Sequence, residues 1–585
     1  MADGSAPGGD RRVGDLLARA EAWVADDPDP LTAAAVEDLL RRIRAGTADE
    51  AITDELAELF RARLEFGTAG LRGALGPGPN RMNRVVVRRA AAGVAAWVNG
   101  HGGGRRLVAI GRDARHGSAA FLDDSVAVLA GAGLDVVVLP EPCPTPVLAF
   151  AVRHLGAAAG IMVTASHNPA SDNGYKVYDA EGRQLDAEQA AAVLGAMDLV
   201  ERVTDLPLAG PGAARVTRAG EEIVDAYLAS LVGLLGAPRT QPRVAVAHTA
   251  LHGVGAATVR AAAWRVGFVD LHEVDDQAVP DPDFPTVAFP NPEEPGALDR
   301  LLEQAAWSRA DVALANDPDA DRLAMAVVDP PGRDPHDPAS WRPLSGDELG
   351  WLLADHLVRR GDLPADGVMA TTIVSSSLLR ALAADAGVAY AETLTGFKWV
   401  ARAPGAHQRL AFGYEEALGY CVGDVVHDKD GIGALLVAAE MVSDVLAAGE
   451  SIPGRLDDLA RRFGVHHTRQ WSVRLEGGAG AARIAAAMAA LRAGGPDRLA
   501  DAAVTRVEDL AFGSPERMLP PSDVVILTTD GGRVVVRPSG TEPKLKAYVE
   551  VVEPVGADGD LPAARARAAE RADAVVAALP AALGL

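Results

Sequence analysis

The sequence has only two cysteines, Cys143 and Cys421, and they are far apart and form no CxxC pair. This scarcity argues against a disulfide framework and against a cysteine zinc site, and it is typical of proteins in a reducing compartment. The first residues include an acid and glycines instead of the apolar run of a signal peptide, and no apolar stretch of roughly 20 residues occurs. We therefore predict a cytoplasmic protein.

Basic charge and aromatic side chains are also scarce. The chain has 56 Lys and Arg against 80 Asp and Glu, a net charge of −24, and only 4% of its residues are aromatic. Nucleic acids and anionic membranes favour net positive charge, and single-stranded nucleic acids also favour aromatic stacking surfaces. We predict no nucleic-acid partner and no membrane partner, so any anionic ligand must be held by local basic residues.

Length and apolar content are ample. The chain has 585 residues, of which 49% are hydrophobic and 23% charged. This is globular composition, and at roughly 100–200 residues per domain it suggests several domains. Dominant disorder is excluded.

Residues 13–66 predict two or three helices, with Asp29 and Thr47 placed as caps. Apolar strands and helices then alternate, which indicates a buried, mostly parallel sheet. The strands are expected at 106–110, 134–139 and 158–164, and the helices at 118–132 and 146–155. The alternation recurs with strands at 243–248, 268–274 and 311–315 and helices at 254–266 and 298–307, and again with strands at 367–372, 389–393 and 410–413 and helices at 376–386 and 432–447.

The last part of the chain changes pattern and predicts an α+β domain. Its strands are expected at 524–528, 533–537 and 545–551, and its helices at 481–492 and 562–578. Together with Pro/Gly-rich breaks at 206–212, 330–343 and 449–454, this predicts four domains. They are an N-terminal helical and α/β domain (1–210), two further α/β domains (211–332 and 333–455) and a C-terminal α+β domain (456–585).

Two polar loops follow apolar strands, where ligands collect in parallel sheets. In the first, Thr164 to Pro169, Ser166 beside His167 and upstream of Lys176 could attack or carry a phosphoryl group, although an ordinary turn is the alternative. In the second, Asp317 and Asp319 together with Asp321 can converge on one hard divalent cation, since unneutralised they would repel one another. A solvated acidic turn is the alternative there.

Two further loops are candidates for substrate contacts. Glu415 and Glu416 suit the hydroxyl groups of a sugar, although acids at a helix N-terminus are an alternative. The loop from Arg537 to Lys544 combines a bidentate cation, hydroxyl donors and a glycine, which together make a phosphate cradle; a plain turn is the alternative. Arg72 lies in a glycine-rich loop, a weaker sign of the same kind.

Taken in order, these motifs resemble the α-D-phosphohexomutase superfamily, the phosphoglucomutase/phosphomannomutase enzymes. The resemblance runs from about Phe66 to Val552 and is carried by FGTAGLRG, TASHNP, NGYKVY, DPDADR, TGFKW, GYEEALGY and RPSGTEPK. Within the superfamily it is closest to the longer branch, which includes phosphopentomutase and glucose-1,6-bisphosphate synthase enzymes.

The resemblance implies four domains around a central cleft, the first three with a similar mixed α/β sheet core. It implies an intramolecular phosphotransferase that interconverts hexose 1-phosphate and hexose 6-phosphate through a phosphoserine and a sugar bisphosphate. It also implies one Mg²⁺ per active site, a sugar 1,6-bisphosphate as activator, small-molecule sugar phosphates as ligands and a monomer or homodimer.

The resemblance also implies roles for individual residues. Ser166 would carry the phosphoryl group and, with Asp317, Asp319 and Asp321, bind the metal. Arg72, His167 and Lys176 would assist proton transfer, and Glu415, Lys398 and Arg322 would contact the sugar. The phosphate that is not transferred would be held by Arg537, Ser539, Gly540 and Thr541.

One position departs from the pattern of many hexomutases. They have a serine two residues after the sugar-binding glutamate, whereas this chain has Ala417. The identity of the sugar therefore stays open, as do phosphopentomutase and bisphosphate synthase as alternative activities.

Overall fold

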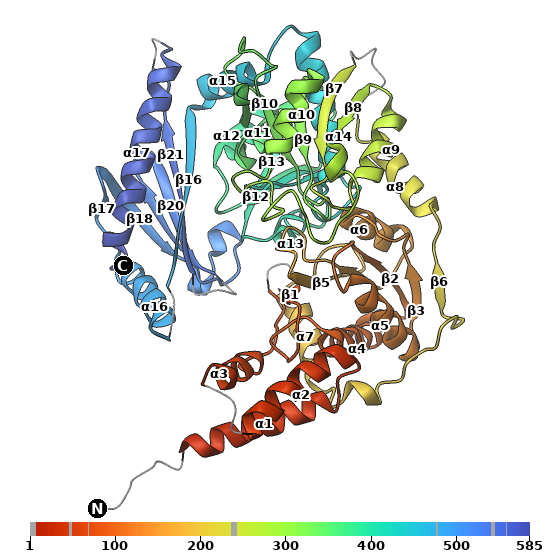
Figure 1. Cartoon of the computed structure of the whole chain (residues 1–585). Helices are drawn as coiled ribbons and strands as arrows, with labels where there is room; N and C mark the ends of the chain where they lie inside the picture. Colours follow the sequence, from red (N-terminus) through yellow and green to blue (C-terminus); the bar gives the residue numbers. More distant parts are fainter. Residues whose placement is uncertain are drawn as a thin grey trace, which may run out of the picture.

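The computed structural model describes residues 8–45, 50–67, 70–235, 243–475, 478–539, 544–556 and 559–585. The predicted cap Thr47 and the predicted phosphate ligands Gly540 and Thr541 lie outside these residues. The described residues form four sheets, each the centre of one domain, here called domains I to IV (Figure 1). The predicted class, a four-domain α/β protein with a C-terminal α+β domain, is confirmed.

Three helices precede the first sheet: α1 (Gly8–Val24), α2 (Pro30–Arg44) and α3 (Glu50–Leu59). They share a small apolar core of their own, which also takes in Val85 from the first helix of domain I. Asp29 caps α2 as predicted, because its carboxylate accepts a hydrogen bond from the N–H of Leu31 at 3.0 Å.

The sheet of domain I has the order β1-β5-β4-β2-β3-β6. The strands are β1 (Leu71–Ala74), β2 (Leu107–Arg112), β3 (Asp135–Val138), β4 (Ala159–Val163), β5 (Asp172–Tyr178) and β6 (Val216–Arg218). The helices are α4 (Arg84–His101), α5 (Ser118–Gly131), α6 (Thr145–His154) and α7 (Ala187–Asp198). β1 pairs antiparallel with β5, and β5 with β4, so the sheet is mixed.

Domain II has the order β11-β10-β9-β7-β8. Its strands are β7 (Val244–Thr249), β8 (Val269–Glu273), β9 (Val312–Ala315), β10 (Ala324–Val328) and β11 (Trp341–Pro343), and its helices are α8 (Glu222–Val232), α9 (Ala256–Val266) and α10 (Asp299–Ser308). β11 pairs with β10, so the sheet of domain II extends past the predicted division at residue 332. β6 pairs with β3, so the sheet of domain I likewise extends past the predicted division at residue 210. The predicted domain bounds otherwise stay a proposal.

Domain III has the order β13-β12-β14-β15. Its strands are β12 (Gly367–Thr372), β13 (Ala389–Thr393), β14 (Arg409–Glu415) and β15 (Gly419–Val422), and its helices are α11 (Gly346–Arg360), α12 (Leu378–Ala386), α13 (Phe397–Val400) and α14 (Gly431–Ala447). β12 runs parallel to β13 and β14, so the chain leaves both β12 and β14 at the same edge of the sheet.

Domain IV follows the helix α15 (Ile452–Phe463) and has the order β16-β21-β20-β19-β18-β17. Its strands are β16 (Val465–Arg474), β17 (Arg498–Leu499), β18 (Ala502–Asp509), β19 (Val525–Thr529), β20 (Gly532–Pro538) and β21 (Lys544–Glu553), and its helices are α16 (Gly478–Arg492) and α17 (Leu561–Ala582). All its strand pairs are antiparallel, which agrees with the predicted α+β character.

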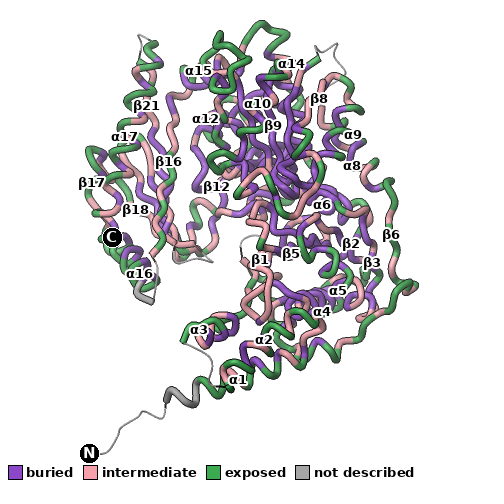
Figure 2. The backbone as a smooth tube through the Cα atoms, in the orientation of Figure 1, coloured by how far each residue is buried: buried purple, intermediate pink, exposed green. Residues whose placement is uncertain are grey.

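One apolar core joins domains II and III and also takes in α6 and single residues of β2, β4 and β5 from domain I, whereas the other core residues of domain I and most of domain IV form separate cores. Figure 2 shows this burial concentrated around β9 and β12. Domain IV has its own core and also shares a smaller apolar cluster with domain III, in which Ile373 and Val374 pack with Val535 and Tyr548. Within the described residues no single helix is long and apolar enough to cross a membrane; α14 and α15 pass that test only as a pair bent by 89°.

Candidate functional site

Ser166 lies in the loop that follows β4 of domain I, and its backbone is left-handed with φ = 54°. Such a conformation is costly for a residue other than glycine and persists only when its surroundings fix it. The buried guanidinium of Arg115 does so, donating hydrogen bonds to the carbonyls of Ser166 at 2.6 Å, Asn168 at 2.5 Å and Pro169 at 2.7 Å. Arg115 thus fixes the backbone of this loop, and the Ser166 hydroxyl points toward domain II.

The Ser166 hydroxyl meets the acidic loop of domain II. Its Oγ donates a hydrogen bond to Oδ2 of Asp317 at 2.7 Å and lies 3.2 Å from Nδ1 of His167. Residues 151 positions apart in sequence are thereby in direct contact. The structure joins a hydroxyl, an imidazole and a carboxylate at one point.

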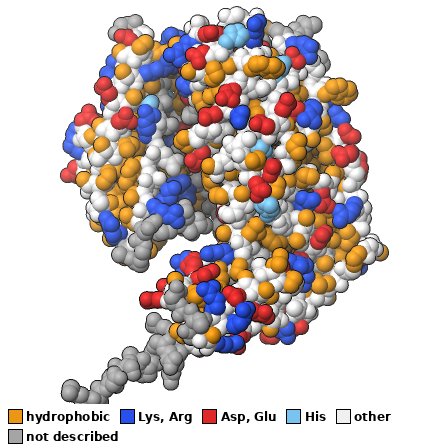
Figure 3. Space-filling model, viewed as in Figure 1, with side chains coloured by type: hydrophobic (Ala, Val, Ile, Leu, Met, Phe, Trp, Pro, Cys, Tyr) orange, Lys and Arg blue, Asp and Glu red, His pale blue; other side chains and the backbone are white. Residues whose placement is uncertain are grey.

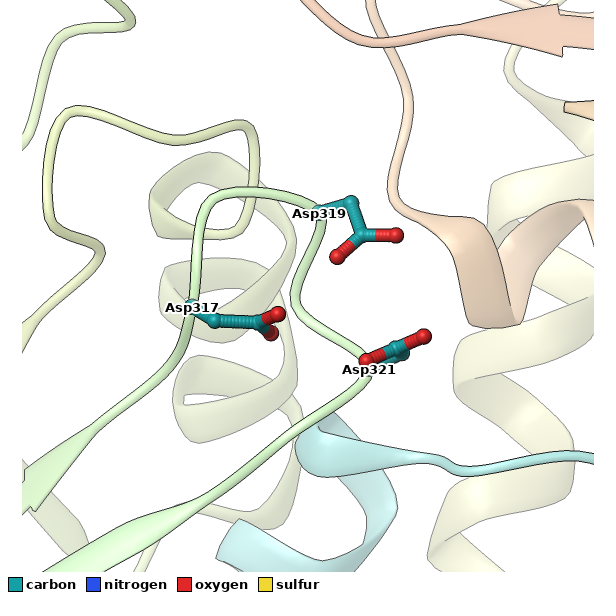
Figure 4. A group of neighbouring side chains, drawn as sticks. All are labelled: Asp317, Asp319 and Asp321. Atoms are coloured by element: carbon teal, nitrogen blue, oxygen red, sulfur yellow. The ribbon is translucent and has the colours of Figure 1, made fainter. Parts of the chain in front are cut away.

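Asp317, Asp319 and Asp321 occupy the loop between β9 and β10, and all three are 0% exposed. Each offers one oxygen that lies within 4.8 Å of those of the other two, and Figure 4 shows the carboxylates gathered around one space. Ala320, between the last two, is left-handed with φ = 59°, which folds the loop back on itself. Three buried carboxylates this close are the oxygen donor set that a hard divalent cation prefers.

One oxygen of Asp319 and one of Asp321, the Oδ2 atom in each, are bound by side chains of domains I and III. Lys176 of domain I donates to Oδ2 of Asp319 at 2.6 Å and of Asp321 at 2.7 Å. Thr145 of domain I donates to the same Oδ2 of Asp319 at 2.6 Å, and Lys429 of domain III lies 3.0 Å from Oδ2 of Asp321.

The opposite oxygens, Oδ1 of Asp319 and of Asp321, are buried and have no hydrogen-bond partner among the described residues. A buried carboxylate oxygen without a partner is unfavourable, and a cation would satisfy both atoms at once. The donor set therefore fits a divalent metal ion.

Crowding of the three acids appears in their pKa values. Burial, followed by the charges of Asp319 and Asp321, raises the pKa of Asp317 to about 8. Burial also acts to raise the pKa of Asp319, but Lys176 outweighs it and the pKa falls below its usual value. One site therefore prefers a proton while its neighbour stays charged, a tension that a cation would relieve.

Basic side chains complete the surroundings. Burial lowers the pKa of Arg72, on β1, against the opposing charges of Asp319 and Asp321. Arg322 donates its backbone N–H to Oδ1 of Asp317 at 3.0 Å. Burial, then Arg322 and Arg72, hold the pKa of His167 well below its usual value, so its imidazole is neutral.

Two of the predicted sugar ligands, Glu415 and Lys398, come from domain III, whereas Arg322 comes from domain II. Glu415 ends β14 and accepts a hydrogen bond from the N–H of Gly396 at 2.7 Å, and the charges of Lys429 and Arg322 act on its carboxyl group. Lys398 lies on α13, where its carbonyl accepts a hydrogen bond from Arg402 at 3.0 Å. Lys429 and Arg322 also contact the acidic loop of domain II, whereas Lys398 lies beside Arg402, which donates to the carbonyl of Gln184 in domain I.

The predicted phosphate ligands that the structure describes, Arg537 and Ser539, come from domain IV. Arg537 lies on β20, and Ser539 follows that strand and donates its N–H to the carbonyl of Lys544 at 2.7 Å. Lys546, on β21, is subject to the charges of Glu416 and Glu293 from domains III and II. Figure 3 shows a deep hollow between domain IV and domain I, with basic side chains on its domain IV side.

Three further residues contribute to the site without a sequence motif that predicts them: Arg115, Thr145 and Lys429. Lys429 follows β15, which is antiparallel to β14, so the rule that ligands collect at the carboxyl ends of parallel strands does not point to it. Arg115 and Thr145 act through backbone carbonyls and across a domain boundary, and their neighbours in sequence give no such signal.

Four family models match the chain in order. The phosphoglucomutase/phosphomannomutase α/β/α domain I matches residues 63–202, α/β/α domain II residues 225–331, α/β/α domain III residues 345–463 and the C-terminal domain residues 473–568. The matches cover most of the chain.

Similar proteins are found along nearly the whole length. A protein of Haemophilus influenzae named "Probable phosphomannomutase" is 37% identical over 476 residues, which is 80% of this chain and 93% of the relative. A phosphoglucomutase of Staphylococcus aureus is 32% identical over 515 residues, 85% of this chain and 91% of the relative.

Solved structures share the fold. A phosphoglucomutase/phosphomannomutase family protein of Burkholderia thailandensis matches with a TM-score of 0.63 and 19% identity, covering 88% of this chain and 98% of its own. The open form of pp63/parafusin from Paramecium matches with a TM-score of 0.66 and 16% identity, covering 90% and 97%.

Proposed function

The chain belongs to the phosphoglucomutase/phosphomannomutase family, and we propose that it interconverts hexose 1-phosphate and hexose 6-phosphate, with glucose, mannose or both as the hexose. It is an isomerase that moves a phosphoryl group within one sugar. The observation that carries the proposal is the 2.7 Å hydrogen bond from Ser166 Oγ to Asp317, inside a buried cluster that fits a metal ion.

The cation of this proposal is Mg²⁺. Asp317, Asp319 and Asp321 would hold it, together with an oxygen of the phosphorylated Ser166. When bound, it would neutralise negative charge on the phosphoryl oxygens, which is the main requirement of phosphoryl transfer. The two partnerless Oδ1 atoms support this assignment.

Ser166 is the carrier in this mechanism. The bond between its Oγ and phosphorus breaks as the free hydroxyl of a sugar monophosphate forms the new bond, which gives a sugar bisphosphate. That bisphosphate reorients in the cleft and returns its other phosphoryl group to Ser166. Positioning and charge neutralisation, not new covalent chemistry, lower the barrier.

The protein's own cations and imidazole serve these steps. Arg72 and Lys176 would compensate the charge of the phosphoryl group, and His167, 3.2 Å from Ser166 Oγ and neutral, can hold the proton of a hydroxyl. Lys176 is engaged by two carboxylates, which makes His167 the freer of the two candidates for that proton.

The remaining predicted residues would hold the substrate. Glu415, Lys398 and Arg322 would contact the sugar, and Arg537, Ser539, Gly540 and Thr541 would bind the phosphate that is not being transferred. A clamp that recognises phosphate, not the sugar ring, accepts either end of the bisphosphate, as reorientation requires.

A panel of substrates tests the proposal. The purified protein would be assayed with glucose 1-phosphate, mannose 1-phosphate and ribose 1-phosphate, each with Mg²⁺ and with or without a sugar 1,6-bisphosphate as activator. We expect turnover of a hexose phosphate that depends on the bisphosphate. Preference for ribose 1-phosphate would indicate phosphopentomutase, and bisphosphate formation from an acyl phosphate would indicate a synthase, but the relatives favour neither.

Other parts of the proposal concern the state of the protein. Sugar phosphates are its small-molecule ligands, and we propose that it works in the cytoplasm as a monomer or homodimer.

A further inference from the structure

A run of three serines, Ser375 to Ser377, connects β12 to α12 in domain III, and we call it the serine segment. Ser375 and Ser376 are buried, at 1% and 0% exposure. The segment lies at the edge of the sheet where β14 ends in Glu415, so it is next to the proposed sugar-binding loop. No proposed catalytic step uses it.

Domain IV grips the serine segment from one side. Arg533, on β20, donates to the carbonyl of Ser375 at 2.6 Å. Glu550, on the neighbouring β21, accepts hydrogen bonds at 2.7 Å from the hydroxyl of Ser376 and from the N–H of Ser377. Arg533 and Glu550 are themselves joined at 3.1 Å, so the two strands present one paired unit to the segment.

The same segment holds the sugar-binding loop from the other side. The hydroxyl of Ser375 donates to Oε2 of Glu416 at 2.9 Å and accepts the N–H of Glu416 at 3.2 Å. The same hydroxyl also lies 2.9 Å from the hydroxyl of Thr372 on β12, so Glu416 takes two of its three hydrogen-bonding positions. Glu416 directly follows Glu415, so Ser375 fixes the backbone beside the proposed sugar ligand.

β20 links this contact to the proposed phosphate clamp. Arg533 lies near the start of the strand and Arg537 near its end, and β21 pairs with both, Glu550 opposite Arg533 and Lys546 opposite Arg537. A hydrogen-bonded ladder of this kind moves as one body. Any shift of domain IV that follows phosphate binding must therefore move Arg533 and Glu550 as well.

Buried ion pairs also join domain IV to domain III. Glu392 of domain III, 5% exposed at its side chain, accepts from Arg533 at 2.7 Å and Arg380 at 2.9 Å, and also pairs with Arg517. Removing a partner from such a buried ion pair is strongly unfavourable, so these ion pairs stabilise the observed position of domain IV against domain III.

We propose that the serine segment couples the seating of domain IV to the sugar-binding loop, with Ser375 and Arg533 as positioning residues for Glu416 and hence for Glu415. When domain IV binds the phosphate of a substrate, it then fixes the position of the loop with Glu415 and Glu416, which contacts the sugar of the same molecule. The proposal rests on the proposed function, because it assumes that both ends of a sugar phosphate are bound in this cleft.

The first test compares two alanine variants of the segment. Ser375→Ala removes the hydroxyl that reaches Glu416 but keeps the carbonyl that Arg533 binds. Ser377→Ala is the matched control, because its hydroxyl contacts Glu550 at 3.1 Å and not Glu416. We expect Ser375→Ala to raise KM for the hexose 1-phosphate about five- to tenfold, as the loss of one buried hydrogen bond predicts, with a much smaller change in kcat.

The inhibition constant of inorganic phosphate shows which end of the substrate is affected. Inorganic phosphate probes the phosphate clamp without a sugar, so its inhibition constant should be the same in Ser375→Ala and in the wild type. Equal KM values for Ser375→Ala and Ser377→Ala, or a parallel loss of phosphate and sugar affinity, would overturn the coupling.

The second test is a double-mutant cycle between Arg533→Met and Ser375→Ala. If Arg533 acts on the sugar loop through Ser375, the two changes in log KM should be markedly less than additive. Arg380→Met is the control, since Arg380 shares Glu392 but does not contact Ser375. Strict additivity would overturn the proposal, and circular dichroism and thermal melting would verify that each variant is folded.

Different results would contradict the proposed function and the proposed coupling through the serine segment. A wild-type protein that turns over no sugar phosphate would contradict the proposed function itself. A wild type that is an active mutase, with Ser375→Ala indistinguishable from Ser377→Ala, would leave that function intact and remove only the coupling.

Discussion

The hydroxyl of Ser166 and the carboxylate of Asp317 are joined by a 2.7 Å hydrogen bond across the boundary between domains I and II. In the proposed mechanism the hydroxyl oxygen of Ser166 carries the phosphoryl group. Ser166→Ala should therefore reduce mutase turnover by several orders of magnitude, because no other described hydroxyl contacts Asp317 in this way. The coupled assay of hexose 1-phosphate conversion measures this.

Ser171 offers a matched control in the same loop. It is exposed, and its hydroxyl only bonds the neighbouring Asp172, at 2.9 Å. Ser171→Ala should keep turnover close to that of the wild type. Equal activity of Ser166→Ala and Ser171→Ala would contradict the role of Ser166.

Asp319→Asn should weaken Mg²⁺ binding by at least about tenfold, because one charged oxygen ligand of the buried cluster becomes a neutral amide. Isothermal titration with Mg²⁺ in the absence of substrate measures this directly, without reliance on turnover. Asp334→Asn, at an exposed position, is the control. Identical titrations for both variants would remove Asp319 from the metal site.

Thr145 fixes the acidic loop of domain II from domain I. Its N–H donates to the carbonyl of Asp319 at 2.9 Å, and its hydroxyl donates to Oδ2 of the same residue at 2.6 Å. Thr145→Val keeps the shape but removes the hydroxyl, and it should lower Mg²⁺ affinity about five- to tenfold. Thr145→Ser should restore it, and a valine variant with wild-type Mg²⁺ affinity would show that the hydroxyl orients nothing.

Glu416 predicts a pH dependence of stability. Burial, then the charges of Glu415 and Asp347, raise its pKa to about 8. The folded state therefore holds a proton that the unfolded state releases near its usual pKa of about 4.3, so this group destabilises the fold progressively as pH rises between those values.

Glu416→Gln mimics the protonated carboxyl at every pH. Its melting temperature should match that of the wild type at about pH 5 and exceed it at about pH 9, where the wild type has a buried charge. Glu516→Gln, whose side chain is 80% exposed, should follow the wild type throughout. A constant difference between Glu416→Gln and the wild type across this range would contradict the raised pKa.

The alternation of apolar strands and helices was sufficient to predict the three α/β domains. The strand predicted at residues 367–372 coincides with β12, and the helix predicted at 432–447 differs from α14 by one residue. β5 was missed because its motif, from Asp172 to Tyr178, is polar in sequence yet buried by pairing with β1 and β4. β11 was missed because it follows a Pro-rich stretch that reads as a linker.

Some residues of the candidate site could be predicted from the sequence and others could not. Loops with their own polar motif, such as the one that contains Asp317, could be predicted, since residues adjacent in sequence share a task there. Thr145 and Lys429 could not, because each meets the acidic cluster only after distant segments pack together. Convergence of the five cations Arg72, Lys176, Lys398, Arg537 and Lys544 on one cleft is also expected from the sequence. Lys176 contacts the acids and the charges of two of them act on Arg72, but the other three come from domains III and IV, and their convergence stays a prediction.

Mapping the phosphorylated residue tests directly whether Ser166 carries the phosphoryl group. The wild-type protein would be incubated with a sugar 1,6-bisphosphate and Mg²⁺, digested, and analysed by peptide mass spectrometry, with Ser166→Ala treated in parallel. The account predicts one phosphoryl group, located on Ser166 and lost when excess hexose monophosphate is added. Turnover without any phosphate on Ser166, or phosphate on another residue that is equally labile, would contradict it.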